Sequence, residues 1–214
     1  MGWFPLFLNL ENAQCLIVGG GKVAYRKAES LLAAGARLHI VSPDFSEEIQ
    51  QIQMRFPDRV SLEAGVYTSR SLAAYTLVIA ATDDRRTNQQ VFADAQRVKV
   101  LVNVVDDPEL CTFQAAALIR RGPLQIAVHT GGECPALAAE IRKEMETAYP
   151  DWLSEYATAL GTIRRVLPKW CDDPEKRKTI LQRLAQKEFR DQCRYLSSEQ
   201  LVDFLQSTVE KLLR

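Results

Sequence analysis

The feature that constrains this chain most is a run of three glycines inside CLIVGGGKVAYRK, Cys15 to Lys27. Gly19, Gly21 and Ala24 fill the spacing G-x-G-x-x-A, the fingerprint of dinucleotide-binding turns. Gly19 permits a tight turn out of the strand, Gly21 lets the backbone approach a pyrophosphate, and Ala24 allows close helix packing. The new helix directs free N–H groups at the phosphates. The pattern predicts a nucleotide-binding turn; the alternative is an ordinary structural one.

The residues after this helix support the nucleotide interpretation. Gly35 is a helix stop signal, and Arg37 to Val41 is a second apolar strand. At the end of that strand, where an acidic residue usually binds the ribose, stands Pro43, with Asp44 just beyond. Asp44 either binds the ribose hydroxyls or caps a helix that starts near Phe45. No arginine directly follows the strand to bind a 2′-phosphate, which favours NAD over NADP.

Alternating strands and helices continue beyond this point. We expect a helix over 45–56, strands at Val60–Glu63, Thr76–Ala80 and Val98–Val104, and a helix from Arg85 to Arg97. Short connections between such elements give right-handed crossovers and a parallel sheet. The predicted fold class is therefore α/β with a Rossmann-like parallel sheet, which binds its ligands at the carboxyl ends of the strands.

Three turns should meet at that edge of the sheet: the glycine turn, the turn at Thr82 and Asp83, and the turn at Asp106. We expect them to line one crevice, and we assign Thr82 and Asp83 to the cofactor. Asp83 has a second interpretation, because aspartate commonly caps a helix start. Asp106 precedes Asp107 and Pro108 without an obvious helix start, so either a catalytic role or a turn role fits.

The pattern changes at Phe113. Two β-like runs, Phe113–Ile119 and Leu124–Thr130, flank residues 120–123 and predict a hairpin. Because an isolated hairpin is marginally stable, its strands should pack on another sheet, which points to a homodimer. The following Gly131 and Gly132 precede a helix that begins with proline, which makes a second anion-ready terminus or a plain connection.

The last part of the chain is helical and charged. We expect helices over roughly Trp152–Val166, Pro174–Arg194 and Ser197–Leu213, with Ser197 and Gln200 forming a capping box. The chain therefore divides into a nucleotide-binding domain over 1–112, a dimerisation region over 113–149 and a C-terminal helical domain over 150–214.

Charge and cysteine usage exclude several classes of protein. Twenty-seven basic and twenty-seven acidic residues cancel, so no global field attracts nucleic acid or an anionic membrane. Five cysteines without a C-x-x-C pair argue against a disulfide framework or a structural metal site. No run reaches the ~20 apolar residues of a membrane span. Residues 1–10 lack the basic leading region and the cleavage site of a signal peptide, so we expect them to form an edge strand beside the first strand. We expect the protein to be cytoplasmic.

Four motifs taken together resemble one family. They are VGGGKVAYRK at Val18–Lys27, AATDD at Ala80–Asp84, NVVDDP at Asn103–Pro108 and HTGGECPALA at His129–Ala138. In this order they resemble the precorrin-2 dehydrogenases, the N-terminal module of siroheme synthase that also occurs as a free protein. The resemblance implies NAD-dependent oxidation of precorrin-2 to sirohydrochlorin and, in some members, insertion of ferrous iron to give siroheme. It also implies a Rossmann domain, a dimerisation region and a helical domain in a homodimer.

The resemblance also assigns residues. The catalytic aspartate of the family falls on Asp106, and its nucleotide contacts fall on Gly19, Gly21, Lys22, Val23, Pro43 and Asp44. The serine that the family commonly has before its Gly-Gly pair is Thr130 here, which keeps a hydroxyl. We expect Thr130, Gly131, Gly132, Arg120 and His129 to contact the substrate, although a packed or exposed His129 without a ligand is an open alternative.

The chemistry of the implied reaction explains why these residue types are needed. NAD accepts only a hydride, so a base such as Asp106 is useful for the accompanying proton, the more so if burial raises its pKa. The tetrapyrrole carries several carboxylates, for which Arg120, Arg121, Arg142 and Lys143 are candidate partners. No Cys/His metal cluster is expected. The alternative function is a non-catalytic Rossmann module that senses NAD(H) and regulates a partner.

Overall fold

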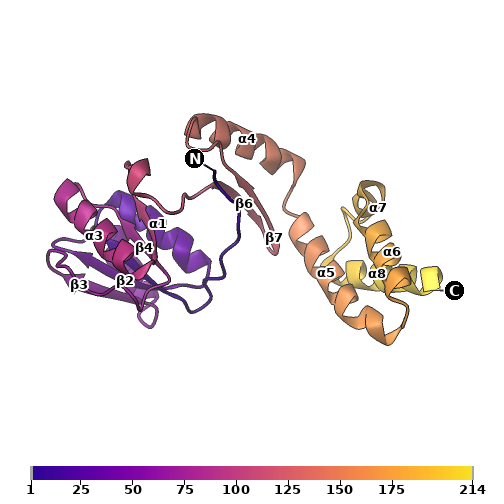
Figure 1. Cartoon of the computed structure of the whole chain (residues 1–214). Helices are drawn as coiled ribbons and strands as arrows, with labels where there is room; N and C mark the ends of the chain where they lie inside the picture. The colour runs from indigo at the N-terminus through magenta and orange to yellow at the C-terminus, as the bar shows by residue number, and fades with distance from the viewer. Residues whose placement is uncertain (1, 214) are drawn as a thin grey trace. The chain divides into compact units, whose positions relative to one another are not determined.

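The computed structural model describes residues 2–213, which form two compact units, one ending at Ala115 and the other beginning at Ala116. Each unit has its own elements and its own core, and each is described by itself. Indigo to magenta marks most of the first unit in Figure 1, and orange to yellow marks the end of the second.

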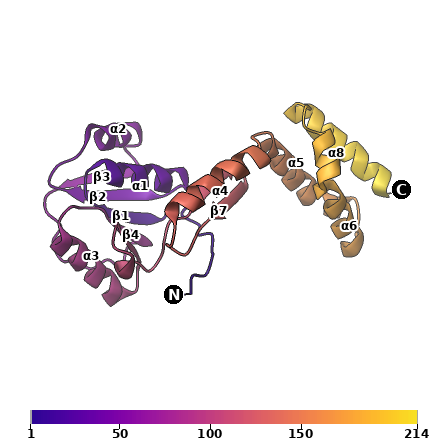
Figure 2. The same ribbon diagram turned by 90° about the horizontal axis from the view of Figure 1, so that it is seen from above.

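The first unit is a parallel five-stranded sheet with the strand order β3-β2-β1-β4-β5. Its strands are β1 (Gln14–Val18), β2 (Arg37–Ser42), β3 (Val60–Ala64), β4 (Leu77–Ala80) and β5 (Leu101–Val104). Its helices are α1 (Lys22–Ala33), α2 (Glu47–Arg55) and α3 (Arg85–Val98), followed by a 3₁₀ turn over Pro108–Leu110. Figure 2 shows α1 and α2 on the side of the sheet opposite α3. This order matches the first five positions of the classic Rossmann order 3-2-1-4-5-6, so the predicted fold class is confirmed.

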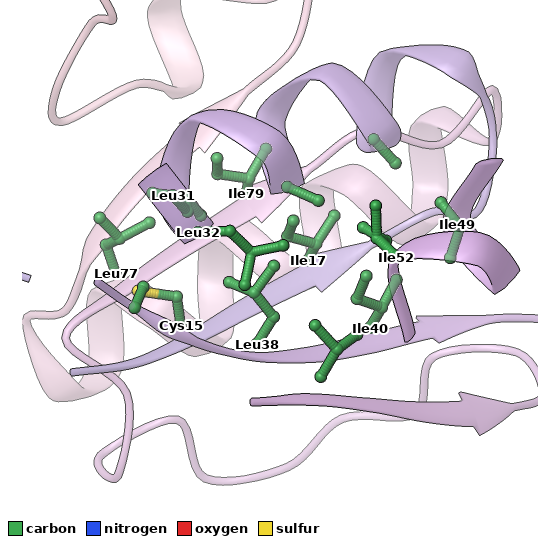
Figure 3. Packing of buried hydrophobic residues seen from close by; sticks show 14 of the residues in the cluster. Cys15, Ile17, Leu31, Leu32, Leu38, Ile40, Ile49, Ile52, Leu77 and Ile79 are labelled. Atoms are coloured by element: carbon green, nitrogen blue, oxygen red, sulfur yellow. The ribbon is translucent and has the colours of Figure 1, made fainter. Parts of the chain in front are cut away.

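Alternate residues of β1 enter two different cores. Cys15 and Ile17 pack with α1 and α2, whereas Leu16 and Val18 pack with α3. In Figure 3, Leu31 and Leu32 of α1 and Ile49 and Ile52 of α2 point at Ile17, Leu38 and Ile40 of the sheet. Burial on both faces explains why the strands are continuous apolar runs instead of alternating ones.

The expected edge strand within residues 1–10 is not formed, because residues 2–10 contain no strand. The physical reason lies in the sheet order: β1 already pairs with β2 on one side and β4 on the other, so it has no free edge. Leu10 alone of this stretch is buried, while Phe4, Leu6 and Phe7 are exposed.

The second unit begins with an antiparallel hairpin of β6 (Ala117–Arg121) and β7 (Leu124–Val128), on which α4 (Pro135–Ala148) packs. The hairpin is confirmed, but Arg120 and Arg121 belong to β6 instead of the turn. Four more helices follow: α5 (Leu153–Val166), α6 (Pro174–Ala185), α7 (Lys187–Gln192) and α8 (Ser198–Leu213), with a 3₁₀ turn at Leu167–Lys169.

These C-terminal helices pack around a third core that includes Ile163, Leu184 and Leu205. The expected continuous helix over 174–194 is wrong, because Gln186 adopts ψ 145° and divides it into α6 and α7. The capping box is confirmed by reciprocal bonds between Ser197 and Gln200, of 3.0 and 3.3 Å. Within residues 2–213, no helix is long and apolar enough to cross a membrane.

Candidate functional site

The glycine turn at the end of β1 is packed tightly against two neighbouring turns. A Cβ on Gly19, whose φ is +121°, would lie 2.2 Å from the Ala81 carbonyl oxygen. A Cβ on Gly20 would lie 1.9 Å from the carbonyl oxygen of Asp44. Both positions therefore require glycine for backbone packing. Gly20 was not among the residues predicted from the sequence, because the G-x-G spacing assigns no role to its middle position.

Gly21 is different, because a Cβ at this position would meet no protein atom within 4 Å apart from its chain neighbours. It is the N-cap of α1, and α1 has neither a side-chain cap nor an acidic residue in its first turn. The first N–H groups of a helix have no partner within the helix, and the helix dipole places partial positive charge there. Open space, free donors and positive potential fit the pyrophosphate of a dinucleotide.

A cavity of about 600 Å³ opens in front of this terminus. It is formed by the glycine turn, the turn after β2 and the turn after β4. Its lining includes all eight residues assigned to the cofactor from the sequence: Gly19, Gly21, Lys22, Val23, Pro43, Asp44, Thr82 and Asp83. The structure therefore brings the predicted cofactor residues together at the carboxyl edge of the sheet, the place where this fold binds ligands.

The structure excludes the capping interpretation of two aspartates. Ser46 caps α2, where its hydroxyl accepts a bond from the Ile49 N–H at 3.5 Å, and Asp84 caps α3. Asp44 and Asp83 instead line the cavity as exposed side chains. The Thr87 hydroxyl, together with the N–H groups of Arg86 and Thr87, holds the pKa of the Asp84 carboxyl below its ordinary value.

Asn88, a buried residue of α3, fixes the wall of this cavity. Its side-chain oxygen accepts a bond from the Thr82 hydroxyl at 2.8 Å, and its amide nitrogen donates to the Thr82 carbonyl oxygen at 2.9 Å. Asn88 was not predicted from the sequence. A polar residue in the first turn of a helix that directly follows a ligand-binding turn could have indicated it. The pair holds Thr82 in place between the cavity and α3.

Asp106 lies in a second cavity, of about 360 Å³, instead of the crevice shared by the other two turns. This cavity is lined by Arg85, Asn88, Val104, Val105, Asp106 and Asp107. The expectation of one crevice is therefore wrong for Asp106. Asn88 lines this second cavity, and its hydrogen-bond partner Thr82 lines the cofactor cavity. The two cavities therefore adjoin across the Thr82–Asn88 pair.

The backbone at Asp106 is left-handed, with φ 61°. Aspartate and asparagine tolerate this region better than other residues with a Cβ, and most others are strained there. The side chain is exposed in the described chain, so the burial expected from the sequence is not observed. Position, conformation and exposure together make Asp106 an accessible carboxylate at the end of β5.

Cys111 and Lys27 lie near the Asp106 turn. The Cys111 thiol contacts the N–H of Val104 at 3.3 Å and the carbonyl oxygen of Asp107 at 3.3 Å, and burial raises its pKa. Burial lowers the pKa of the Lys27 amine, and the positive charge of Arg26 acts in the same direction, while Asp106 and Cys111 oppose it. Lys27 is therefore a half-buried amine within electrostatic reach of Asp106.

The predicted substrate residues Arg120, His129, Thr130, Gly131 and Gly132 all lie in the second unit. Gly131 and Gly132 have φ of 71° and 91°, which suits glycine. The Gly131 N–H donates to Nδ1 of His129 at 3.2 Å, and the Thr130 hydroxyl accepts a bond from the Cys134 N–H at 3.2 Å. The Thr130 side chain thus orders the loop before α4.

Three of the basic candidates for substrate carboxylates are already paired with acidic side chains. Arg121 lies 2.9 Å from Asp151, Lys143 lies 2.7 Å from Glu140, and Arg142 pairs with Glu146. In the described part of the chain, no group of three or more His, Cys, Asp or Glu side chains is arranged to hold a metal ion.

Comparisons with known proteins agree with the sequence motifs. Residues 6–117 match a family model, NAD_binding_7, for NAD(P)-binding domains, and residues 121–148 match one described as "Sirohaem biosynthesis protein central". Siroheme synthase of Nitrosomonas eutropha is 37% identical over 209 residues, covering 98% of this chain and 44% of that protein. Siroheme synthase of Chromobacterium violaceum is 45% identical over 152 residues, 70% of this chain and 32% of that protein.

The chain thus spans less than half the length of these relatives. The solved structure of SirC, a precorrin-2 dehydrogenase, has a TM-score of 0.76 at 23% identity and covers 97% of this chain and 100% of that one, which shows a shared fold. The first family model covers more than half of the chain. The chain therefore belongs to the NAD(P)-binding family that this model describes, with the sirohaem biosynthesis central region following its nucleotide-binding domain.

Proposed function

We propose that this protein oxidises precorrin-2 to sirohydrochlorin with NAD as the hydride acceptor. One observation carries the proposal: a cavity with an uncapped helix terminus adjoins a second cavity that holds an accessible carboxylate. This arrangement suits a reaction in which a hydride and a proton leave one substrate toward two different acceptors. The similarity to siroheme synthases and the sirohaem central region point to the tetrapyrrole.

In the proposed mechanism, bound NAD supplies the acceptor for the hydride. The N–H groups of the first turn of α1 would hold its pyrophosphate, and the Asp44 carboxylate would accept bonds from its ribose hydroxyls. The Thr82–Asn88 pair fixes the wall between the two cavities. The Asp106 carboxylate accepts the proton that leaves the tetrapyrrole, so that one hydride and one proton account for the oxidation.

The test is NADH formation from precorrin-2 and NAD, followed by absorbance in wild type and in Asp106→Asn. Asparagine keeps the left-handed backbone unstrained and removes the base, whereas Asp106→Ala adds backbone strain. We expect Asp106→Asn to lose at least roughly 100-fold in turnover, as general-base removal typically does, with unchanged NAD affinity. Unchanged NADH formation in this variant would remove Asp106 from the mechanism.

The rival function, a module that senses NAD(H) without turnover, gives the opposite result in the same assay. It predicts nucleotide binding with no oxidation of precorrin-2 by the wild-type protein. The adjoining Asp106 cavity favours the enzyme, because a sensor needs only the first cavity.

Insertion of ferrous iron into sirohydrochlorin is the second activity that we propose for the same site. Two pyrrole protons must leave as the iron enters: the Asp106 carboxylate can accept one of them, and the other passes to solvent in the exposed cavity. Absorption spectra of sirohydrochlorin mixed with ferrous iron and protein test this step, against protein-free and Asp106→Asn controls. Metallation at the protein-free rate would limit the protein to the dehydrogenase step.

We further propose a cytoplasmic homodimer with 1–112 as the nucleotide domain, 113–149 as the dimerisation region and 150–214 as the helical domain. Support for the dimer comes from the two-stranded sheet of β6 and β7, because no further strand pairs with its outer edges in the described residues and such edges can pair with a second copy of the chain. Five free cysteines suit a reducing compartment. Sedimentation of a monomer alone would exclude the dimer, and cell fractionation tests the compartment.

A further inference from the structure

The cavity that contains Asp106 has an unusual charge arrangement. Two of its lining side chains, Asp106 and Asp107, are acidic, and one, Arg85, is basic. None of the three takes part in an ion pair in the described part of the chain. Arg85 is an exposed residue that lines the cavity, and its guanidinium has no acidic partner in the described residues.

A polyanionic ligand would be repelled by the two carboxylates unless a cation in the same cavity opposes them. Arg85 is the cationic side chain among the lining residues. Its guanidinium presents several N–H donors in a planar fork that can bind a carboxylate through two parallel bonds. This charge and geometry match an acidic side chain on the rim of a tetrapyrrole.

The backbone that carries Arg85 is held firmly. Arg85 is the first residue of α3 and follows the cap residue Asp84, which accepts bonds from the N–H groups of Arg86 and Thr87. One turn later, Asn88 is bonded to Thr82. Because the backbone is already fixed, only the rotamers of the Arg85 side chain need to be ordered when a ligand binds.

The neighbouring arginine provides a natural control. Arg86 has the same charge and follows Arg85 in α3, yet it does not line the cavity. Arg85 also differs from Arg121, Arg142 and Lys143, which already pair with acids.

We propose that Arg85 binds a carboxylate of the tetrapyrrole substrate in the cavity beside Asp106. The inference rests on the proposed function, since it names the part of the site that recognises the acidic rim of the ligand. It assigns to Arg85 a role in substrate affinity and not in proton transfer.

The test is equilibrium binding of sirohydrochlorin, without NAD, to wild type and to Arg85→Gln, Arg85→Lys and Arg86→Gln. We expect Arg85→Gln to weaken binding at least about tenfold, which corresponds to roughly 1.4 kcal/mol. Arg85→Lys should recover part of the loss because it keeps the charge but not the fork. Arg86→Gln should bind as wild type does, and NAD affinity should be equal in all four proteins.

In turnover assays, the Arg85→Gln defect should fall on KM for precorrin-2, with kcat largely retained. Equal sirohydrochlorin affinity in wild type, Arg85→Gln and Arg86→Gln would overturn the role of Arg85 and leave the proposed function standing. Equal losses in both glutamine variants would also overturn it, because general charge would then explain binding. Wild-type protein that binds no tetrapyrrole would remove the proposed function itself, and this inference with it.

Discussion

Helices α1 and α3 both begin at the carboxyl edge of the same sheet, yet their first turns are built differently. α1 starts after Gly21, with no side-chain cap and no acid in its first turn. α3 starts after Asp84, whose carboxylate accepts bonds from the N–H groups of Arg86 and Thr87 at 3.1 and 3.2 Å. One helix leaves its donors open to a cavity of about 600 Å³, and the other satisfies its own.

The difference teaches how one architecture separates ligand binding from structural stability. A carboxylate at Asp84 fills the place that an anion would take at α3, so that terminus contributes to folding. The glycine at the start of α1 has no side chain to accept hydrogen bonds from the first N–H groups of that helix, so these donors are available for phosphates. Four predictions test this contrast.

The largest effect is expected from Gly21→Asp, which would give α1 the kind of cap that α3 has. Gly21 has an extended backbone with φ −89°, so aspartate fits without strain. We expect NAD affinity to fall at least roughly 100-fold, since the carboxylate occupies the phosphate position, while the melting temperature stays equal or rises. Calorimetric titration and thermal unfolding measure the two quantities.

The matched control is Gly21→Ala, which adds volume without charge. Its loss of NAD affinity should be smaller than that of the aspartate variant. If the aspartate variant kept wild-type NAD affinity, the uncapped terminus of α1 would not be the phosphate site.

The second prediction concerns Asn88→Ala, which leaves the cap of α3 in place but removes its tie to Thr82. Three hydrogen bonds join the buried Asn88 to Thr82, and in the variant the Thr82 carbonyl oxygen loses its side-chain donor. We expect the free energy of unfolding to fall by about 1–3 kcal/mol, measured by urea denaturation. NADH formation should fall further than NAD affinity, because the wall between the cavities is loosened; an unchanged stability would contradict the role of the pair.

A smaller effect is expected from Asp84→Ala, the reverse of the first substitution. Loss of the cap should lower the melting temperature by a few degrees, as for other helix caps. NAD affinity should be that of the wild type, because the open terminus belongs to α1. A large loss of NAD affinity with unchanged stability would show that the two helix starts have been assigned the wrong way round.

The smallest effect is the pH dependence of this cap. The folded-state pKa of Asp84 lies below its ordinary value, so its contribution is present above the unfolded pKa of about 4 and is lost as pH falls through the folded value. The difference in melting temperature between wild type and Asp84→Ala should therefore be constant near neutrality and vanish in strong acid. A difference that grows toward low pH would contradict the sign.

The sequence was sufficient for the elements of the first unit because its apolar runs are interrupted by strong stop signals. Gly35 ends the first helix region with φ 90°, and the strand positions follow within a few residues. The edge strand predicted within residues 1–10 was wrong, because apolar composition does not reveal that β2 and β4 already occupy both edges of β1. The break at Gln186 was not predicted either, because it has no glycine or proline to mark it.

The nucleotide half of the candidate site was predictable because the fingerprint and the topology rule place its residues at one edge. The rest depends on packing that local patterns do not encode. The choice between Asp44 and Ser46 as the cap of α2 is settled by which side chain reaches the Ile49 N–H. Likewise, Asn88 and Arg85 gain their positions only when α3 is placed against the end of β5.

The backbone packing around Gly20 has a consequence for how the nucleotide cavity behaves before any ligand arrives. The Gly20 carbonyl oxygen accepts a bond from the Ser46 N–H at 2.9 Å. The Cα of Gly20 lies so close to the Asp44 carbonyl oxygen that a methyl group on it would not fit. The loop that follows β2 is therefore locked to the loop that follows β1, so both walls exist in advance. Binding should then be fast and carry little ordering cost, and slow amide exchange at Ser46 should already be present in the free protein.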